Sequence, residues 1–235
     1  MVSPAARAVT RAPSLEDLRA GLLAEHADTL DAARLDVVDR ELRRMGAASI
    51  RGDVVELGCY RGAMALWMRA VLDDAGDHAR KIRVYDSFQG LPAPGDRDDP
   101  TTLADFDLSA TPLDVRRLHT RWGRRCPEIF AGWFADTLPV RLPESISFAY
   151  LDGDYYSSIL VSLEQVVPRL TPGASLIVDD YADTVVNPAA WNGLPGVKAA
   201  CDDYFGAPGS LTVLFGPAGS DLAFGRYTRA VVSGQ

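Results

Sequence analysis

Short apolar runs alternate with longer amphipathic stretches along most of this chain. Near-continuous apolar runs indicate strands buried on both faces, and stretches with helical spacing between them indicate crossover helices. The expected strands lie at about 53–57, 82–86, 128–133, 146–151, 174–178, 211–215 and 222–227. The expected helices lie at about 62–75, 113–125 and 195–205, and a helix-like stretch of about twenty residues separates the fourth and fifth strands.

The order of these elements predicts a doubly wound α/β sheet, because strands that alternate with helices pair in parallel through crossovers. We expect a Rossmann-like, mostly parallel sheet of seven strands with helices on both faces. The last two strands are joined by Gly216-Pro217-Ala218-Gly219-Ser220, which suits an antiparallel hairpin at the C-terminal end.

Residues 1–48 are expected to form an N-terminal helical extension ahead of a domain at 49–235. Residues 1–12 are rich in Ala, Arg and Pro and are expected to be loose. Ser14, followed three residues later by Asp17, has the pattern of an N-cap, and helical spacing of apolar residues continues to Met45. The helices can cover one edge of the sheet, form a wall of the substrate pocket or serve as a dimer arm, and the pattern allows all three.

The composition of the chain limits the kinds of binding partner and the cellular compartment that we expect. The chain has 235 residues, 47% of them hydrophobic, which is enough to bury a full core. A net charge of -8 argues against a nucleic-acid or anionic-membrane partner. No apolar run is long enough to span a bilayer, and the first residues lack the apolar core of a signal peptide. Three scattered cysteines favour packing roles, so we expect a cytoplasmic protein.

Two groups of aspartates directly follow the fourth and fifth expected strands. Asp152 and Asp154 form the first group, and Asp179 and Asp180 form the second. The carboxyl ends of neighbouring parallel strands meet in the crevice where open α/β sheets bind ligands. Like charges repel one another there unless a cation or shared protons relieve them. The sequence therefore predicts a site for a hard divalent ion, with one carboxylate left over for chemistry.

A glycine turn from Glu56 through Gly58 and Tyr60 to Gly62 follows the first strand, where such folds bind a nucleotide-like cofactor. Tyr60 stands where the dinucleotide fingerprint has its second glycine, which counts against NAD or FAD and hence against a dehydrogenase. S-adenosylmethionine fits better, because it has no phosphates and its cationic end can meet carboxylates. Asp86 ends the second strand, where it can accept hydrogen bonds from both ribose hydroxyls, a helix cap or loop position being the alternative.

Other candidates lie in the loops and on the histidines. The polar loop at roughly 87–112 is long enough to be an expected lid. Trp191 can stack on an acceptor sugar or plug the edge of the sheet. His26 and His78 are expected at the solvated surface, and His119 is expected on a solvated helix face, although it could approach the acceptor.

Five segments together resemble the macrocin O-methyltransferase (TylF-like) family. They are VVELGCYRG at 54–62, YDSFQGLP at 85–92, GWFADTLP at 132–139, LDGDYYSS at 151–158 and VDDY at 178–181. The resemblance covers about 50–227 and leaves the N-terminal fifty residues outside it. It implies a class I methyltransferase fold, S-adenosylmethionine, Mg²⁺ and methylation of a sugar hydroxyl on an antibiotic-type natural product. It also implies at least a homodimer.

The resemblance assigns roles residue by residue. It implies that Asp152, Asp179 and Asp180 are metal ligands and that Asp154 is the base. The cofactor contacts that follow from the turn and from the resemblance are Glu56, Gly58, Tyr60, Asp86, Ser87, Trp133, Phe134, Asp136 and Asp152. Trp133 and Phe134 would flank the adenine, and Asp136 would reach its amino group.

The chemistry of the residues leaves alternatives open. A sugar hydroxyl is almost wholly protonated at neutral pH, so a metal that lowers its pKa and a nearby base both help. Asp154 can be that base or can cap the helix expected to begin near Ser157. No lysine follows Asp152 in its turn, which favours a sugar or polyol over a catechol acceptor. A catechol or polyphenol acceptor and a non-catalytic adenosyl-binding homologue remain the alternatives.

Overall fold

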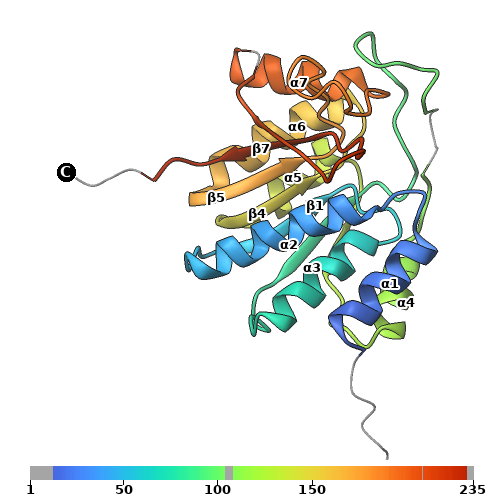
Figure 1. Ribbon diagram of the computed structural model, residues 1–235, viewed down its shortest axis with the longest axis vertical. Helices are drawn as coiled ribbons and strands as arrows, with labels where there is room; N and C mark the ends of the chain where they lie inside the picture. Colours follow the sequence, from blue (N-terminus) through green and yellow to red (C-terminus); the bar gives the residue numbers. More distant parts are fainter. Residues whose placement is uncertain (1–12, 104–107, 208, 232–235) are drawn as a thin grey trace, which may run out of the picture.

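Seven strands form a single sheet in the order β3-β2-β1-β4-β5-β7-β6 (Figure 1). The computed structural model describes residues 13–103, 108–207 and 209–231. The first five strands pair in parallel, and β7 is antiparallel to both β5 and β6, as expected. The strands are β1 (Asp53–Leu57), β2 (Ile82–Asp86), β3 (Glu128–Ala131), β4 (Ile146–Leu151), β5 (Leu170–Val178), β6 (Thr212–Leu214) and β7 (Phe224–Thr228).

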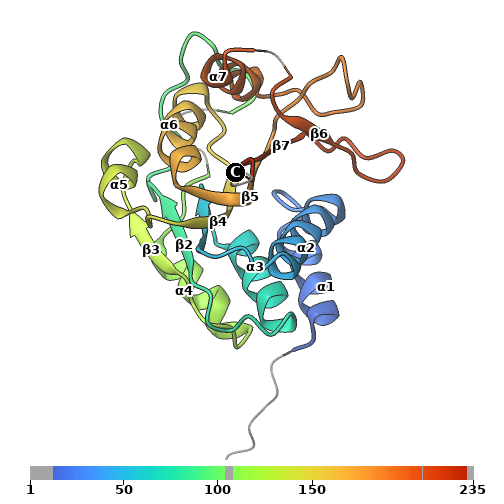
Figure 2. The ribbon, with the colours of Figure 1, turned by 90° about the vertical axis from the view of Figure 1, so that its left-hand side faces the viewer.

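Helices cover both faces of the sheet (Figure 2). The helices are α1 (Leu15–Glu25), α2 (Ala32–Ala47), α3 (Ala63–Asp74), α4 (Pro112–Arg121), α5 (Phe134–Arg141), α6 (Tyr156–Val166) and α7 (Pro195–Phe205), with a 3₁₀ turn at Val167–Arg169. The first four lie on one face, and α5, α6 and α7 lie on the other. Within the described ranges, no helix is both long and apolar enough to cross a bilayer.

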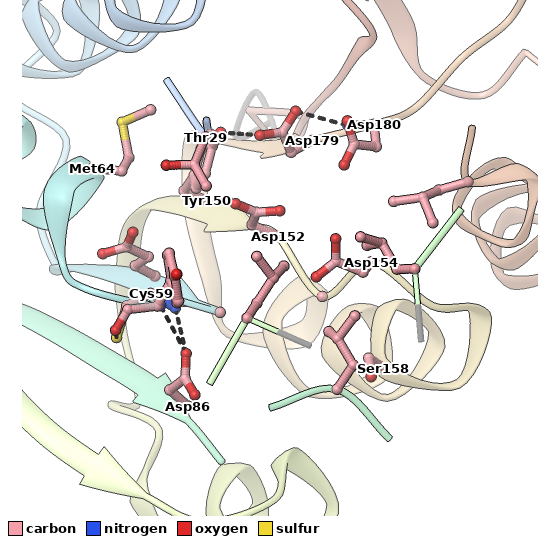
Figure 3. Close-up of a pocket in the computed structure, with 18 of the residues that line it drawn as sticks. Thr29, Cys59, Met64, Asp86, Tyr150, Asp152, Asp154, Ser158, Asp179 and Asp180 are labelled. Carbon is pink, nitrogen blue, oxygen red and sulfur yellow. Dashed lines mark hydrogen bonds between the residues drawn. The ribbon is translucent and has the colours of Figure 1, made fainter. Parts of the chain in front are cut away.

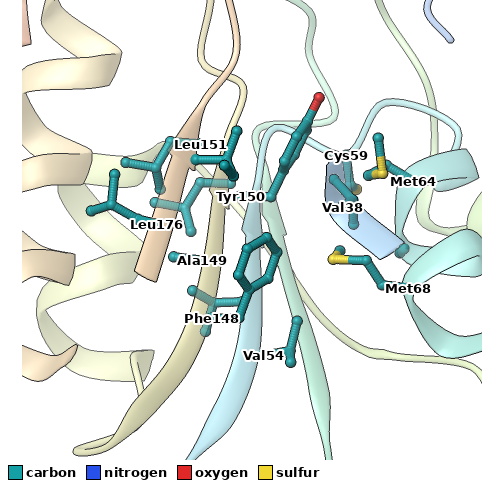
Figure 4. Packing of buried hydrophobic residues seen from close by; sticks show 14 of the residues in the cluster. Val38, Val54, Cys59, Met64, Met68, Phe148, Ala149, Tyr150, Leu151 and Leu176 are labelled. Atoms are coloured by element: carbon teal, nitrogen blue, oxygen red, sulfur yellow. The ribbon is translucent and has the colours of Figure 1, made fainter. Parts of the chain in front are cut away.

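The central strand β4 shows why these residues form a sheet buried on both faces. All six of its residues are buried, because it lies between β1 and β5 and under helices on each side. Phe148 and Tyr150 point toward the helices that carry Val38 and Met68, whereas Leu151 points to the opposite face (Figure 4). This packing fixes the ends of the central strands, where the site lies.

The N-terminal helices begin with the expected cap, and they lie on one face of the sheet. Ser14 and Asp17 form a reciprocal capping box at the start of α1, as predicted. Asp31 caps α2 by accepting a hydrogen bond of 2.8 Å from the Arg34 backbone N–H. α2 packs over β4 and β5, so it covers a face of the sheet and not its edge. The residues that lead into α2 also line the central cavity, so the N-terminal segment is both a cover and a wall.

The observed elements differ from the sequence-based expectation at several points. Helix α5 was missed, because it has only eight residues, contains Pro139 and buries only Leu138 fully, which leaves no readable periodicity. β5 begins at Leu170, four residues before the expected start. Its first residues include a Pro and a Gly, which are uncommon inside strands, so the sequence did not indicate this start. α4 ends at Arg121 and not near 125, since Gly123 with φ of 62° follows its C-cap.

The expectation for two of the histidines was wrong. His119 is fully buried and His26 is nearly so, whereas His78 is exposed as expected. His119 Nδ1 lies 3.0 Å from the Arg125 carbonyl oxygen, and its Nε2 has no partner among the described residues. Burial lowers the pKa of His119 to about 4, and the nearby positive charge of Arg69 acts in the same direction. His119 is therefore a neutral core residue, far from the candidate site.

Candidate active site

A cavity of about 730 Å³ opens at the carboxyl ends of β1, β2, β4 and β5. It lies where the strand order reverses between β1 and β4, which is the place at which doubly wound sheets bind ligands. Its volume is within the range of small-molecule sites. One side is lined by the glycine turn after β1 and by the start of α5, and the other by residues 27–31 and by the loop that carries Trp191.

The four aspartates singled out in the sequence all line this cavity (Figure 3). Carboxylate oxygens of Asp152, Asp154 and Asp180 lie within 4.8 Å of one another. Asp154 and Asp180 have left-handed backbones, with φ of 59° and 56°, and these sharp turns place consecutive carboxyl groups around one space. Such an all-oxygen donor set suits Mg²⁺.

Burial and mutual repulsion make it unfavourable for several of these aspartates to be negatively charged at the same time. Burial raises the pKa of Asp152 and of Asp180 well above the usual value, and the negative charge of Asp179 raises both further. Burial, then Asp179, raises the pKa of Asp154 to about 7. A cation bound between these groups would relieve both the desolvation and the repulsion. The donor set, the spacing and the charge therefore fit a divalent metal ion.

Both carboxylate oxygens of Asp179 already have partners. Arg34 Nε lies 3.3 Å from Asp179 Oδ2, and Arg34 Nη2 lies 3.2 Å from Asp179 Oδ1. The Tyr150 hydroxyl donates to Oδ2, and the Asp180 backbone N–H donates to Oδ1 at 2.8 Å. Asp179 raises the pKa of Arg34 strongly, which keeps the guanidinium charged.

Asp154 does not cap the following helix. The N-cap of α6 is Tyr155, which makes no side-chain capping bond. The carboxylate of Asp98, from the long loop, instead accepts a hydrogen bond of 2.8 Å from the Tyr156 backbone N–H. The capping interpretation of Asp154 was therefore wrong, and its side chain faces the cavity (Figure 3).

The long loop is held over this side of the molecule by contacts with distant segments. Besides the cap made by Asp98, the Thr102 hydroxyl donates to the Gly193 carbonyl oxygen at 2.8 Å. The Tyr155 hydroxyl donates to the Leu103 carbonyl oxygen at 2.7 Å. Leu91, Thr102 and Leu103 line the cavity, which is the position that a lid requires.

The glycine turn after β1 is built by Asp86 and by close backbone packing. Asp86 Oδ2 accepts hydrogen bonds of 2.9 Å from the backbone N–H groups of Cys59 and Tyr60 (Figure 3). Gly58 has φ of +84°, and a Cβ there would lie 1.7 Å from the Asp152 carbonyl oxygen. Gly58 is therefore required because the turns after β1 and β4 approach each other closely.

Glu56 is the least satisfied polar group of the cavity. It is 1% exposed, and its Oε2 has no hydrogen-bond partner in the described part of the chain. Burial, then the charge of Asp86, raises the pKa of Glu56 well above its usual value. An unpaired buried carboxyl group is costly. A bound ligand that brings an N–H donor would satisfy it, which fits a cofactor with an amino-acid end.

The other predicted cofactor contacts divide into two groups. Tyr60, Ser87, Trp133 and Phe134 line the cavity, whereas Asp136 is exposed and lies outside its lining. The Ser87 hydroxyl donates to the Gly90 carbonyl oxygen at 2.8 Å, so it builds the turn after β2. Trp133 and Phe134 come from the start of α5, and not from a strand end as expected.

Sequence reasoning allowed the N-terminal segment to form a wall of the pocket but did not identify the residues that it contributes. Arg34, Asp31 and Thr29 line the cavity, and Tyr150 reaches the aspartates from within β4. The only signal for Arg34 was a charged residue between apolar positions of its helix, and this does not identify a partner. Trp191 lines the cavity, which favours the acceptor-stacking interpretation over that of a plug for the sheet edge.

A family model for macrocin O-methyltransferases (TylF) matches residues 25–194. The match begins within the N-terminal helices, ahead of the segment that carried the resemblance, and includes α2 and all four aspartates.

Relatives of assigned activity show the same similarity over shorter stretches. A methyltransferase from Streptomyces olivaceus, described as an 8-demethyl-8-(2,3-dimethoxy-alpha-L-rhamnosyl)-tetracenomycin-C 4'-O-methyltransferase, is 39% identical over 63% of this chain and 60% of its own length. The mycinamicin III 3''-O-methyltransferase of Micromonospora griseorubida is 34% identical over 56% of each chain. The matched stretches thus span less than two thirds of these relatives. The solved O-methyltransferase NovP has a TM-score of 0.69 at 25% identity, covering 85% of this chain and 80% of that chain.

Proposed function

Because the chain belongs to the macrocin O-methyltransferase (TylF) family, we propose that it transfers the methyl group of S-adenosylmethionine to a sugar hydroxyl of a glycosylated secondary metabolite, with Mg²⁺ as the metal. One observation carries the proposal. The carboxylates of Asp152, Asp154 and Asp180 converge in the same cavity that contains the unpartnered Glu56 carboxyl group. A metal-type donor set and a site for a cationic ligand therefore share one space.

The cofactor occupies the side of the cavity next to β1 and β2. Glu56 accepts a hydrogen bond from the amino group of the cofactor, and this contact satisfies its buried Oε2. Among the described residues, Asp86 Oδ1 accepts only the Phe88 N–H, so it keeps a lone pair for a ribose hydroxyl. Trp133 and Phe134 flank the adenine. Asp136 takes no part, because it lies outside the cavity lining.

Asp152 and Asp180 would hold the metal ion, and Asp179 would join them once it gives up one of its present donors. Their oxygens are the hard ligands that Mg²⁺ prefers, and the repulsion among them explains why a cation is needed. When bound, the ion supplies a positive charge that lowers the pKa of a coordinated hydroxyl group. The residues of the chain provide the remaining chemistry.

Asp154 takes the proton of the acceptor hydroxyl. Its carboxylate faces the cavity beside Asp152 and Asp180 and is not used in capping α6. The acceptor oxygen forms a bond to the methyl carbon while the carbon–sulfur bond breaks, and the products are a methyl ether, S-adenosylhomocysteine and protonated Asp154. Much of the rate enhancement comes from holding the hydroxyl in line with the methyl group.

The acceptor side of the cavity favours a sugar. Asp28, Thr29, Asp31 and Asp221 offer hydrogen-bonding groups there, and Trp191 offers an aromatic surface. This mixture suits a ring that carries several hydroxyls on one apolar face. The names of the two relatives, one a rhamnosyl-tetracenomycin and the other a mycinamicin methyltransferase, support the same class of acceptor. One alternative is a catechol or polyphenol acceptor. A second alternative is that the protein is a non-catalytic homologue that binds the adenosyl cofactor.

The test is calorimetric titration with S-adenosylmethionine, followed by methyl transfer to glycosylated-antibiotic and catechol panels with Mg²⁺ or EDTA. We expect cofactor binding and metal-dependent methylation of a sugar hydroxyl, lost in Asp180→Asn and kept in Asp36→Asn, an exposed α2 variant. Methylation restricted to catechols would show that the acceptor is a catechol and not a sugar. Methyl transfer that EDTA leaves unchanged would show that the reaction needs no metal ion. Failure to bind the cofactor would overturn the whole proposal.

A further inference from the structure

A basic residue from the N-terminal segment enters the aspartate cluster. Arg34, in the first turn of α2, has a side chain that is only 17% exposed. Its Nη2 lies 3.2 Å from both Asp179 Oδ1 and Asp180 Oδ1, and its Nε lies 3.3 Å from Asp179 Oδ2. Its Nη1 donates to the Asp31 carboxylate. The guanidinium therefore forks onto one of the proposed metal ligands and touches a second.

Donors surround both carboxylate oxygens of Asp179. Oδ1 accepts a hydrogen bond from the Asp180 backbone N–H and is ion-paired with Arg34 Nη2, and Oδ2 accepts hydrogen bonds from Arg34 Nε and from the Tyr150 hydroxyl. A cation that binds Asp179 must therefore compete with these donors. Arg34 is the donor whose charge a cation would replace.

We propose that Arg34 is a built-in competitor for the metal ion: its guanidinium pairs with Asp179 when no metal is bound and gives up this pair when a divalent cation binds. The inference rests on the proposed function, because it concerns the same cluster. Arg34 supplies a positive charge that stabilises the crowded carboxylates of the metal-free protein. The same charge weakens metal binding, both by repulsion and by occupying a ligand.

Metal affinity measured in the absence of cofactor and acceptor tests this proposal. Isothermal calorimetry with Mg²⁺ and with Mn²⁺ should show that Arg34→Met binds at least about tenfold more tightly than wild type. Arg34→Lys keeps a charge but cannot fork, so its affinity should be intermediate, and Arg34→Gln serves if the Met variant does not fold. Arg43→Met is the matched control, because Arg43 lies on the same helix but its partners among the described residues are Asp39 and Asp74, outside the cluster.

A second variant shows whether the competition is for Asp179. In an Asp179→Asn background, replacing Arg34 by Met should give little or none of the gain in metal affinity. The metal-free Arg34→Met protein should also melt at a lower temperature than wild type, and saturating Mg²⁺ should raise its melting temperature more than that of wild type. These readouts do not depend on catalysis.

The outcomes separate this inference from the proposed function. If wild type binds the metal ion and Arg34→Met binds it no more tightly, Arg34 only positions the aspartates. The proposal that Arg34 competes with the metal ion is then wrong. A gain that persists unchanged in the Asp179→Asn background also overturns it. If neither wild type nor Arg34→Met binds Mg²⁺ or Mn²⁺, both the competition and the metal-dependent part of the proposed function fail. Tight binding in Arg34→Met alone supports the competition.

Discussion

The carboxylate of Asp98 accepts a hydrogen bond of 2.8 Å from the backbone N–H of Tyr156, so a residue of the long loop caps the helix that follows Asp152 and Asp154 of the candidate site. The other oxygen of Asp98 accepts from the Gly95 N–H, also at 2.8 Å. One side chain thus folds its own loop and ties it to the start of α6, only two residues after Asp154. The position of the lid and the position of Asp154 are therefore coupled through this bond.

Replacing Asp98 by Ala should loosen the lid. We expect a loss of about 1 kcal/mol in the free energy of unfolding, the usual cost of a missing helix cap. Limited proteolysis should cleave the loop near Thr102 faster than in wild type. Asp99→Ala is the matched control, because the hydrogen bonds of the Asp99 side chain to described residues stay within its own turn, at Thr101. Equal cleavage rates in the two variants would contradict the coupling.

Acid should destabilise the protein through His119. Its folded-state pKa of about 4 lies below the unfolded value near 6.5, so the unfolded chain takes up the proton first. The contribution to stability is complete above about pH 6.5 and falls by roughly 3 kcal/mol as the pH drops to 4.

Chemical denaturation between pH 4 and 7 isolates this effect by comparing wild type with His119→Asn. Asn can donate to the Arg125 carbonyl oxygen in place of Nδ1 but does not titrate. The difference in unfolding free energy between the two proteins should shrink as the pH falls. The buried carboxyl groups of the site are the same in both proteins and cancel in this comparison. A difference that does not change with pH would rule out His119 as the cause.

Gly58→Ala should be far more harmful than an ordinary glycine substitution. The added Cβ would lie 1.7 Å from the Asp152 carbonyl oxygen, so the two turns must separate. We expect a loss of about 3 kcal/mol or more, together with loss of cofactor binding. Gly76→Ala is the control, because Gly76 has a similar φ of +79° but no atom within 4 Å of a Cβ, and it should cost only about 1 kcal/mol. Thermal unfolding of both variants gives the comparison, and similar losses would refute the steric argument.

Glu56→Gln should weaken cofactor binding without lowering the stability of the cofactor-free protein. Glu56 is buried with an unpartnered oxygen, so a neutral side chain of the same shape should leave the cofactor-free protein equally stable or more stable. Cofactor affinity should fall about 10- to 100-fold, because a charge-assisted hydrogen bond is lost. Calorimetry and thermal unfolding measure the two effects.

Glu41→Gln provides the opposite case for comparison. Glu41 is also buried, but it pairs with Arg44 and Arg226, so its replacement should lower stability and leave cofactor binding unchanged. If Glu56→Gln destabilised the cofactor-free protein as much as Glu41→Gln, Glu56 would have an internal partner and no need of a ligand.

Local patterns were sufficient for much of the fold. The apolar runs predicted all seven strands, and the reason is clearest in β4, because a strand buried on both faces needs a continuous apolar sequence. Ser14 and Asp17 predicted the start of α1, since a capping box depends on residues only three positions apart. Asp152 and Asp180 were predicted to meet, because parallel strands bring their carboxyl ends to one edge. Short helices such as α5 carry too few turns for the same analysis.

The sequence by itself determined the strands, the turn at Gly58 and the grouping of the aspartates, because each depends on neighbouring residues or on strand direction. Only the tertiary structure decided which side chains meet across the chain. Arg34 lies 145 positions from Asp179, Asp98 lies 58 positions from Tyr156, and both pairs exist because helix packing and loop closure bring them together. The same packing buries His119, although Arg116, Arg117 and Arg121 lie close to it in the sequence. Long-range packing is absent from local periodicity, and it controls the partners of these charged groups.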